Sequence, residues 1–282
     1  MKNIVIVTDS SAGIPERLAR LLGLDVVPIS VQIDDEVYKE GVDLSAEHFY
    51  SQLEKAKSVT TSQPSPGDFL AVYKRAAKRA KEIISIHVTG LGSGTVNVAN
   101  LIKKQLSVPI SVVDSKTASM AQGFMALAAA KAAQAGKTRE EIMEIIENVK
   151  QRTAIFVAVP TLKYLTKSGR VGSMKSLIAS ALAIKPILGV KDGLVDVVAR
   201  VRSYPRALQR LITLIEERFP ATELNIAILH TNAPAQAEEL KKAVEKRLKH
   251  IQIFTAKMSA SLAVHGGAGM LGIAAYGGPA LD

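Results

Sequence analysis

Small hydroxyl side chains gather at four places in this sequence. The run at 58–69 reads SVTTSQPSPGDF and comes just before a helical pattern, and related clusters occur at 8–11 (TDSS), 89–95 (TGLGSGT) and 114–119 (DSKTAS). Serine and threonine hydroxyls can hold an anionic group through hydrogen bonds without placing a charged side chain against it. The same residue types also serve as ordinary helix caps. Each cluster therefore allows two interpretations, a cap or a binding site for an anion.

Three of the four clusters follow segments that the sequence predicts to be buried strands. These apolar runs are 3–8, 83–88 and 110–113. Because ligands bind beyond the carboxyl ends of strands in an open parallel sheet, we expect the three clusters to meet at one edge. The stretch TTSQPS (60–65) is expected to be a loop just ahead of a helix, and this loop can reach the same edge. Ser93 and Gly94 are expected at a helix N-terminus, where free amides and the helix dipole favour an anion.

Two further stretches carry residues capable of chemistry. In VHGGAGMLGIAAYGG (264–278), His265 lies beside glycines in what reads as a flexible loop, and a functional histidine is favoured there over a structural one. In LTKSGRVGS (165–173), Arg170 lies in a basic loop bracketed by glycines. A solvated loop charge is the ordinary interpretation of Arg170, and a contact to a partner or to a phosphate is the alternative.

Several catalytic and cofactor motifs are absent from the sequence. There is no G-x-x-x-x-G-K-[ST] phosphate loop, and GLGSG (90–94) has the wrong spacing for a dinucleotide-binding turn. Ser93 does not lie in a G-x-S-x-G elbow, because Leu91 occupies the first glycine position. The chain has no cysteine, and its five histidines lack the helical spacing of a metal site. We therefore predict neither a cofactor nor a metal ion.

Composition narrows the range of partners. The formal charge is +10, but the basic residues are spread along helix faces, aromatic residues make up 4% of the chain, and tryptophan is absent. Little is available to stack on bases, so a solvated surface is favoured over a nucleic-acid interface. No apolar run reaches the ~18 residues needed to span a bilayer, and the lack of cysteine fits a reducing compartment. We expect a cytoplasmic protein with no nucleic-acid partner and no integral membrane segment.

The chain is long enough for about two domains. In the first half, strands alternate with helices, which predicts an N-terminal α/β domain at 1–152 with a doubly wound, mainly parallel sheet. Residues 153–282 predict a second α/β domain with antiparallel pairing, including a hairpin around KDG (191–193). A strand is expected over 26–33. A long alanine-rich helix is expected after Asp114, either lining a ligand cavity or packing closely against its neighbours.

Seven stretches occur in a fixed order between residues 8 and 272. They are TDSSAGIP, TTSQPSPGDF, GSGTVNVA, VVDS, LKYLTKSGRVG, IKPIL followed by DGLV, and VHGGAGMLG. This ordered set resembles the DegV family of fatty-acid-binding proteins, which serve as acyl-carrying subunits of bacterial fatty acid kinase. Two departures are GSGTV at 92–96, where the family usually has LSGTY, and GGAG at 266–269, where it usually has a TGPG-like segment. Both departures remove bulk near the expected head-group site.

The resemblance implies a ligand tunnel between the two α/β domains, with a long-chain, palmitate-like fatty acid inside it. It implies that Thr61, Ser93 and His265 hold the carboxylate. The ligand site predicted in this way also includes neighbours of these residues, namely Ser62, Gly94, Thr95 and Gly266. Arg170 corresponds to an arginine that the family associates with engagement of the kinase subunit.

Three functional hypotheses follow. The first is a non-catalytic protein that binds a long-chain fatty acid and presents its carboxylate to a separate ATP-dependent kinase, which forms an acyl phosphate. The second is a free-standing esterase that uses Ser93 and His265. The third is a carrier of a small anionic ligand held at the Ser93 helix end. The absence of lysine and arginine from the loops near Thr61 and Ser93 argues against the third.

Overall fold

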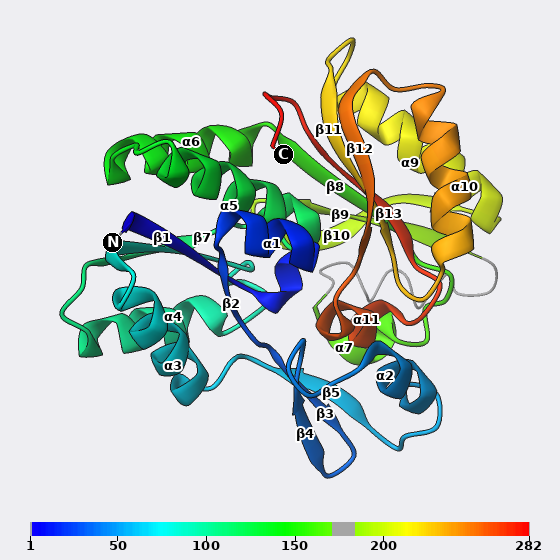
Figure 1. The fold of residues 1–282 in the computed structure, drawn as a ribbon. Helices are drawn as coiled ribbons and strands as arrows, with labels where there is room; N and C mark the ends of the chain where they lie inside the picture. Colours follow the sequence, from blue (N-terminus) through cyan, green and yellow to red (C-terminus); the bar gives the residue numbers. More distant parts are fainter. Residues whose placement is uncertain (1, 171–183, 282) are drawn as a thin grey trace.

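The first half of the chain builds a parallel sheet. The computed structural model describes residues 2–170 and 184–281 (Figure 1). The sheet has four strands in the order β2-β1-β6-β7, and all three pairings are parallel. Its strands are β1 (Lys2–Asp9), β2 (Asp25–Val27), β6 (Ala80–His87) and β7 (Ile110–Asp114). The alternation of strands and helices predicted this sheet, and the structure confirms it.

Helices cover both faces of the parallel sheet because its strands are apolar on both sides. Ile4 and Ile6 pack with one group of helices, and Val5 and Val7 pack with another. The first group is α1 (Glu16–Leu22), α5 (Ser119–Gln134) and α6 (Arg139–Gln151); the second is α3 (Pro66–Ala77) and α4 (Thr95–Ile102). Two short 3₁₀ turns, η1 (Ser10–Ala12) and η2 (Lys103–Gln105), complete this half. Helix α4 continues directly into η2.

The second half builds a larger sheet with mostly antiparallel pairing. Its order is β10-β9-β8-β13-β11-β12, and only the β11–β12 pair among these is parallel. The strands are β8 (Thr153–Ala158), β9 (Lys185–Lys191), β10 (Leu194–Val201), β11 (Leu224–His230), β12 (His250–Lys257) and β13 (Leu271–Tyr276). Asp192 and Gly193 have φ of 51° and 88° between β9 and β10. Positive φ at both residues is typical of the tight hairpin turn that the KDG sequence predicted.

Helices also flank the larger sheet. Helices α9 (Tyr204–Arg218) and α10 (Pro234–Glu245) cover one face, and two short helices, α7 (Leu165–Ser168) and α11 (Ala260–Gly266), lie near its edge toward the first half (Figure 1). Antiparallel pairing in this half was predicted, and the structure confirms it. Strand β13 was not predicted, because its sequence LGIAAY contains a single β-branched residue.

Helix α5 occupies the space between the two sheets (Figure 1). All of its residues from 119 to 130 are buried, and they share one core with strands of both sheets. A helix that is apolar all round needs neighbours on every side, and small alanine side chains let both sheets approach it. Close packing is therefore the role of its alanines. Because this core joins both sheets, the domain boundary at residue 152 stays a prediction.

A third, small sheet corrects two expectations. Its order is β4-β3-β5, all antiparallel, and α2 (Ala46–Gln52) packs beside it. The strands are β3 (Ser30–Ile33), β4 (Glu36–Lys39) and β5 (Val59–Ser62). The single strand expected over 26–33 is wrong: the chain leaves the parallel sheet at Pro28, which has no amide hydrogen to continue a ladder. The loop expected at 60–65 is wrong in part, because its first half belongs to β5.

Candidate functional site

A cavity of about 490 Å³ lies where the two larger sheets and the small sheet come together. This volume falls in the range of small-molecule sites. Much of its wall is apolar and comes from the larger sheet and nearby segments: Val88, Ile155, Val157, Leu188, Val195 and Met258. Polar groups enter from the hydroxyl clusters at the carboxyl ends of β1 and β6 and from β5. The cavity therefore combines a largely apolar wall with a few hydrogen-bonding groups.

Thr61 and His265 meet in the cavity wall although 204 positions separate them in sequence. Thr61 Oγ1 lies 3.2 Å from His265 Nε2. Thr61 belongs to β5, and His265 lies in the last turn of α11, which packs through Ala263 and Val264 on the small sheet. The loop expected around His265 is therefore wrong. Ser259 caps α11, a signal that could have revealed the helix.

His265 is an uncharged hydrogen-bonding group near neutral pH. Burial lowers the pKa of His265, and the nearby Arg170 cation lowers it further, to about 4. A neutral imidazole donates one hydrogen bond and accepts another. At neutral pH the Thr61–His265 pair can therefore bind an oxygen atom without contributing a charge of its own.

The Ser93 cluster lies at the start of α4. Ser93 Oγ is 2.7 Å from Thr95 Oγ1, and the Thr95 amide donates to Ser93 Oγ at 3.3 Å. Gly94 is the N-terminal cap residue and has no side-chain cap bond. A Cβ on Gly94 would lie 3.2 Å from Gln63 Oε1, so α4 begins directly against the segment that follows β5. Ser62, Ser93, Gly94 and Gly266 line the cavity, whereas Thr95 is buried and does not.

Arg170 is exposed and also contributes to the cavity lining. Its Nη1 donates to the Ser168 carbonyl oxygen at 2.7 Å. The predicted basic loop is in part the helix α7, which ends at Gly169 with φ of 62°; Val171 to Ser173 lie outside the described residues. A cation therefore reaches the cavity, which weakens the sequence argument against a small anionic ligand.

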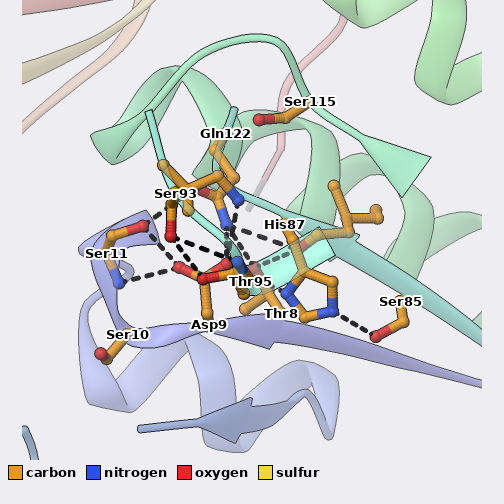
Figure 2. A network of polar contacts seen from close by, with 12 residues as sticks. Thr8, Asp9, Ser10, Ser11, Ser85, His87, Ser93, Thr95, Ser115 and Gln122 are labelled. Atoms are coloured by element: carbon orange, nitrogen blue, oxygen red, sulfur yellow. Dashed lines mark hydrogen bonds and ion pairs between the residues drawn. The ribbon is translucent and has the colours of Figure 1, made fainter. Parts of the chain in front are cut away.

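Asp9 is buried at the end of β1, where it accepts hydrogen bonds from several neighbouring segments (Figure 2). Its carboxylate accepts hydrogen bonds from the Val88 amide at 2.9 Å, Gln122 Nε2 at 3.1 Å, His87 Nδ1 at 3.0 Å, and the Ser11 amide at 3.1 Å. Burial alone would raise the pKa of Asp9, but the hydrogen bond and electrostatic interaction with His87, and the hydrogen bonds from the Ser11 side chain and the Val88 amide, outweigh burial and hold the pKa below its usual value. Asp9 thereby positions Ser11 and Val88, which both line the cavity.

The same network contains a serine–histidine–aspartate chain that does not reach the cavity. Ser85 Oγ lies 2.6 Å from His87 Nε2, and Tyr73 donates its hydroxyl hydrogen to Ser85 Oγ at 2.9 Å. The side chains of Asp9, Ser85, His87 and Tyr73 are fully buried. A nucleophile must be reachable by its substrate, so this chain is a structural support.

Glu40 links α11 to the 3₁₀ turn η1 through hydrogen bonds. No sequence motif indicated this residue. Its carboxylate accepts hydrogen bonds from Ser10 Oγ at 2.6 Å, from the Ser261 amide at 3.0 Å and from Ser261 Oγ at 2.8 Å. Burial raises the pKa of Glu40, and these hydrogen bonds oppose the rise. The contact holds α11, and with it His265, against η1.

The arrangement does not form the serine–histidine pair of an esterase. Ser93 is bonded to Thr95 and His265 to Thr61, and no hydrogen bond joins Ser93 to His265, both of which are described. In residues 2–170 and 184–281, no group of three or more His, Asp or Glu side chains could hold a metal ion. Across the same residues, no helix has the length and apolar character needed to cross a membrane.

The fold and the site define an α/β protein with two larger sheets, a small third sheet, a largely apolar cavity and a neutral polar pair in the cavity wall. A family model described as "Uncharacterised protein, DegV family" matches residues 3–277. A DegV domain-containing protein of Streptomyces coelicolor is 34% identical over 274 residues, covering 96% of this chain and 98% of that protein. This chain belongs to the DegV family, as its motifs indicated.

Solved structures of the family are closely similar. The structure described as fatty acid binding of a DegV family protein from Thermus thermophilus has a TM-score of 0.91 and 28% identity, covering 98% of this chain and 100% of that chain. DegV from Bacillus subtilis, described as a fatty acid binding protein, has a TM-score of 0.89 and 29% identity, covering 99% and 100%. These likenesses extend over both larger sheets.

Proposed function

We propose that this protein binds a long-chain fatty acid in the cavity between its sheets and presents the carboxylate to a separate ATP-dependent kinase. The acid is the substrate of that kinase, and the product is an acyl phosphate. In this proposal Thr61, Ser93 and His265 surround the carboxylate, with Ser62, Gly94 and Gly266 beside them. The single observation that carries the proposal is the apolar cavity with the Thr61–His265 pair in its wall.

In this proposal, the apolar wall of the cavity provides most of the affinity for the acyl chain. About 14 methylene groups gain roughly 11 kcal/mol on leaving water, at about 0.8 kcal/mol for each. Association and chain ordering remove a large share of that gain. What remains is sufficient for tight binding of a long chain, whereas a small anion would leave the apolar wall in contact with water. A small anionic ligand is therefore the weaker candidate, even with Arg170 in the lining.

The neutral polar groups suit a carboxylate that must react. Hydroxyl and imidazole groups orient the carboxylate through single hydrogen bonds. A bidentate arginine would engage both oxygens more strongly and reduce their reactivity toward a phosphoryl group. The exposed Arg170 supports a separate role for its guanidinium, which is to contact the kinase or the phosphate during transfer.

Equilibrium binding to delipidated protein tests the fatty-acid site. We expect palmitate to bind more tightly than its methyl ester, because the ester has no charged carboxylate for the polar groups to receive. His265→Ala should lower affinity for palmitate about tenfold and leave affinity for the ester nearly unchanged. His48→Ala is the matched control, since His48 is exposed on α2 and outside the cavity lining. Equal affinity for acid and ester in every variant would contradict the proposal.

A further inference from the structure

The Ser119 side chain is polar, buried and unsatisfied. Ser119 is the first residue of α5 and lines the cavity, and only 1% of its surface is exposed. No residue among 2–170 and 184–281 offers a hydrogen-bond partner to Ser119 Oγ, and among these residues no other buried side-chain nitrogen or oxygen lacks a partner. Buried hydroxyls are nearly always paired in folded proteins, so an orphan in a cavity wall requires an explanation.

The backbone conformation of Ser119 is a second, independent observation that points to a functional role for this residue. Its φ is 55°, in the left-handed region that a residue with a Cβ rarely adopts. Glycine would adopt this conformation without strain. The neighbouring polar groups are satisfied, because Ser115 Oγ donates to the Thr117 carbonyl oxygen at 3.1 Å and accepts from the Thr117 amide at 3.2 Å. Strain and an unpaired hydroxyl therefore coincide at one residue of the binding cavity, which is where functional strain accumulates.

Ser119 and the Thr61–His265 pair lie near opposite ends of α11. A Cβ on Gly13 would lie 3.8 Å from Ser119 Oγ and 3.2 Å from the Lys257 carbonyl oxygen, which places Ser119 near the end of β12. Helix α11 begins three residues after Lys257 and carries His265 in its last turn. Its seven residues span about 10 Å. Ser119 and His265 line the same cavity, so a ligand with its carboxylate at His265 and an acyl chain of about 14 methylenes is long enough to bring a chain atom to Ser119.

We propose that the Ser119 hydroxyl hydrogen-bonds an oxygen substituent on the acyl chain, so that the cavity prefers a hydroxylated or keto fatty acid to the unsubstituted acid. This inference rests on the proposed fatty-acid site and narrows its substrate class. A hydroxyl group both donates and accepts, so it can pair with a chain hydroxyl or a chain carbonyl. A plain methylene beside Ser119 Oγ leaves the buried hydroxyl unpaired, which is the basis for rejecting the unsubstituted chain.

Competition binding with a positional series of monohydroxylated palmitic acids tests the preference. We expect the wild-type protein to bind one member, or two adjacent members, about tenfold more tightly than palmitate. Ser119→Ala should abolish that preference and bind palmitate more tightly than the wild type does. Ser119→Gly should behave like Ser119→Ala in selectivity and also unfold at a higher temperature, because glycine suits the backbone. Ser119→Gly keeps the test valid if the alanine variant folds poorly.

Two results would overturn the inference. One is a wild-type protein that binds palmitate at least as tightly as every hydroxylated member, which would mean that Ser119 Oγ pairs with water. The other is a preference that survives unchanged in both Ser119 variants. Either result leaves the fatty-acid site standing, whereas failure of the wild-type protein to bind palmitate and all hydroxylated acids would contradict the proposed function itself.

Discussion

At the scale of single residues, the site depends on polar groups that sequence alone could not pair. The SVTTSQPS and VHGG stretches drew attention to Thr61 and His265 as separate features, and the family resemblance joined them. Nothing in local pattern encodes a contact across 204 positions, because that contact depends on α11 packing against the small sheet. The strained backbone of Ser119 and the missing hydrogen-bond partner of its hydroxyl also could not be predicted from the sequence, because both depend on the residues that surround Ser119 in the fold.

The low pKa of His265 predicts a loss of stability in mild acid. The pKa is about 4 in the folded protein and about 6.5 in the unfolded chain. Between these values the unfolded chain binds a proton that the folded protein does not, so stability falls as pH falls from about 6.5 to about 4. The contribution to the free energy of unfolding is about 3 kcal/mol at most.

Urea denaturation at pH 7 and at pH 4.5 checks this prediction. We expect His265→Gln, which cannot take up a proton, to lose less stability over this interval than the wild-type protein. Comparison with the variant isolates the histidine from the carboxylates that also titrate in acid. A stability difference between the two proteins that stays constant with pH would show that His265 does not titrate as described.

At the scale of elements, the sequence was most informative where local chemistry is strong. Ser65 with Asp68 and Thr138 with Glu141 form the capping boxes that begin α3 and α6, and their three-residue spacing is visible in the sequence. The small sheet was missed because β4 and β5 are short and mostly exposed, which leaves little hydrophobic alternation to detect. The role of α5 needed the structure, since an alanine-rich helix fits a cavity wall and a tight interface equally well.

Because α5 lies between the two larger sheets, we expect larger side chains at its buried positions to destabilise the protein. Ala129 is fully buried in the shared core, whereas Ala135 follows the helix and is exposed. We expect Ala129→Leu to lower the free energy of unfolding by about 1–3 kcal/mol through overpacking, and Ala135→Leu to change it little. Denaturant titration of both variants measures the difference. Equal stability of the two variants would contradict the close packing of α5 against both sheets.

At the scale of the whole molecule, α5 joins the two larger sheets in one core, and Arg170 is exposed at the lining of the cavity. We expect Arg170→Ala to bind fatty acid normally but to lose acyl phosphate formation when mixed with ATP and a cognate fatty acid kinase. Arg170→Lys should recover only part of the activity, because an ammonium cannot reproduce a planar guanidinium fork. Lys163→Ala removes another exposed cation and serves as the control. Wild-type phosphorylation of Arg170→Ala under limiting kinase would make Arg170 an ordinary surface charge.

The central claim is that the cavity holds a long-chain fatty acid, and mass spectrometry of an organic extract from the purified protein tests it most directly. A ligand buried along an apolar wall is released slowly, so it should survive purification. We predict roughly one long-chain acid for each protein molecule. Protein that carries no acid, and takes up none after incubation with fatty acids, would contradict the account.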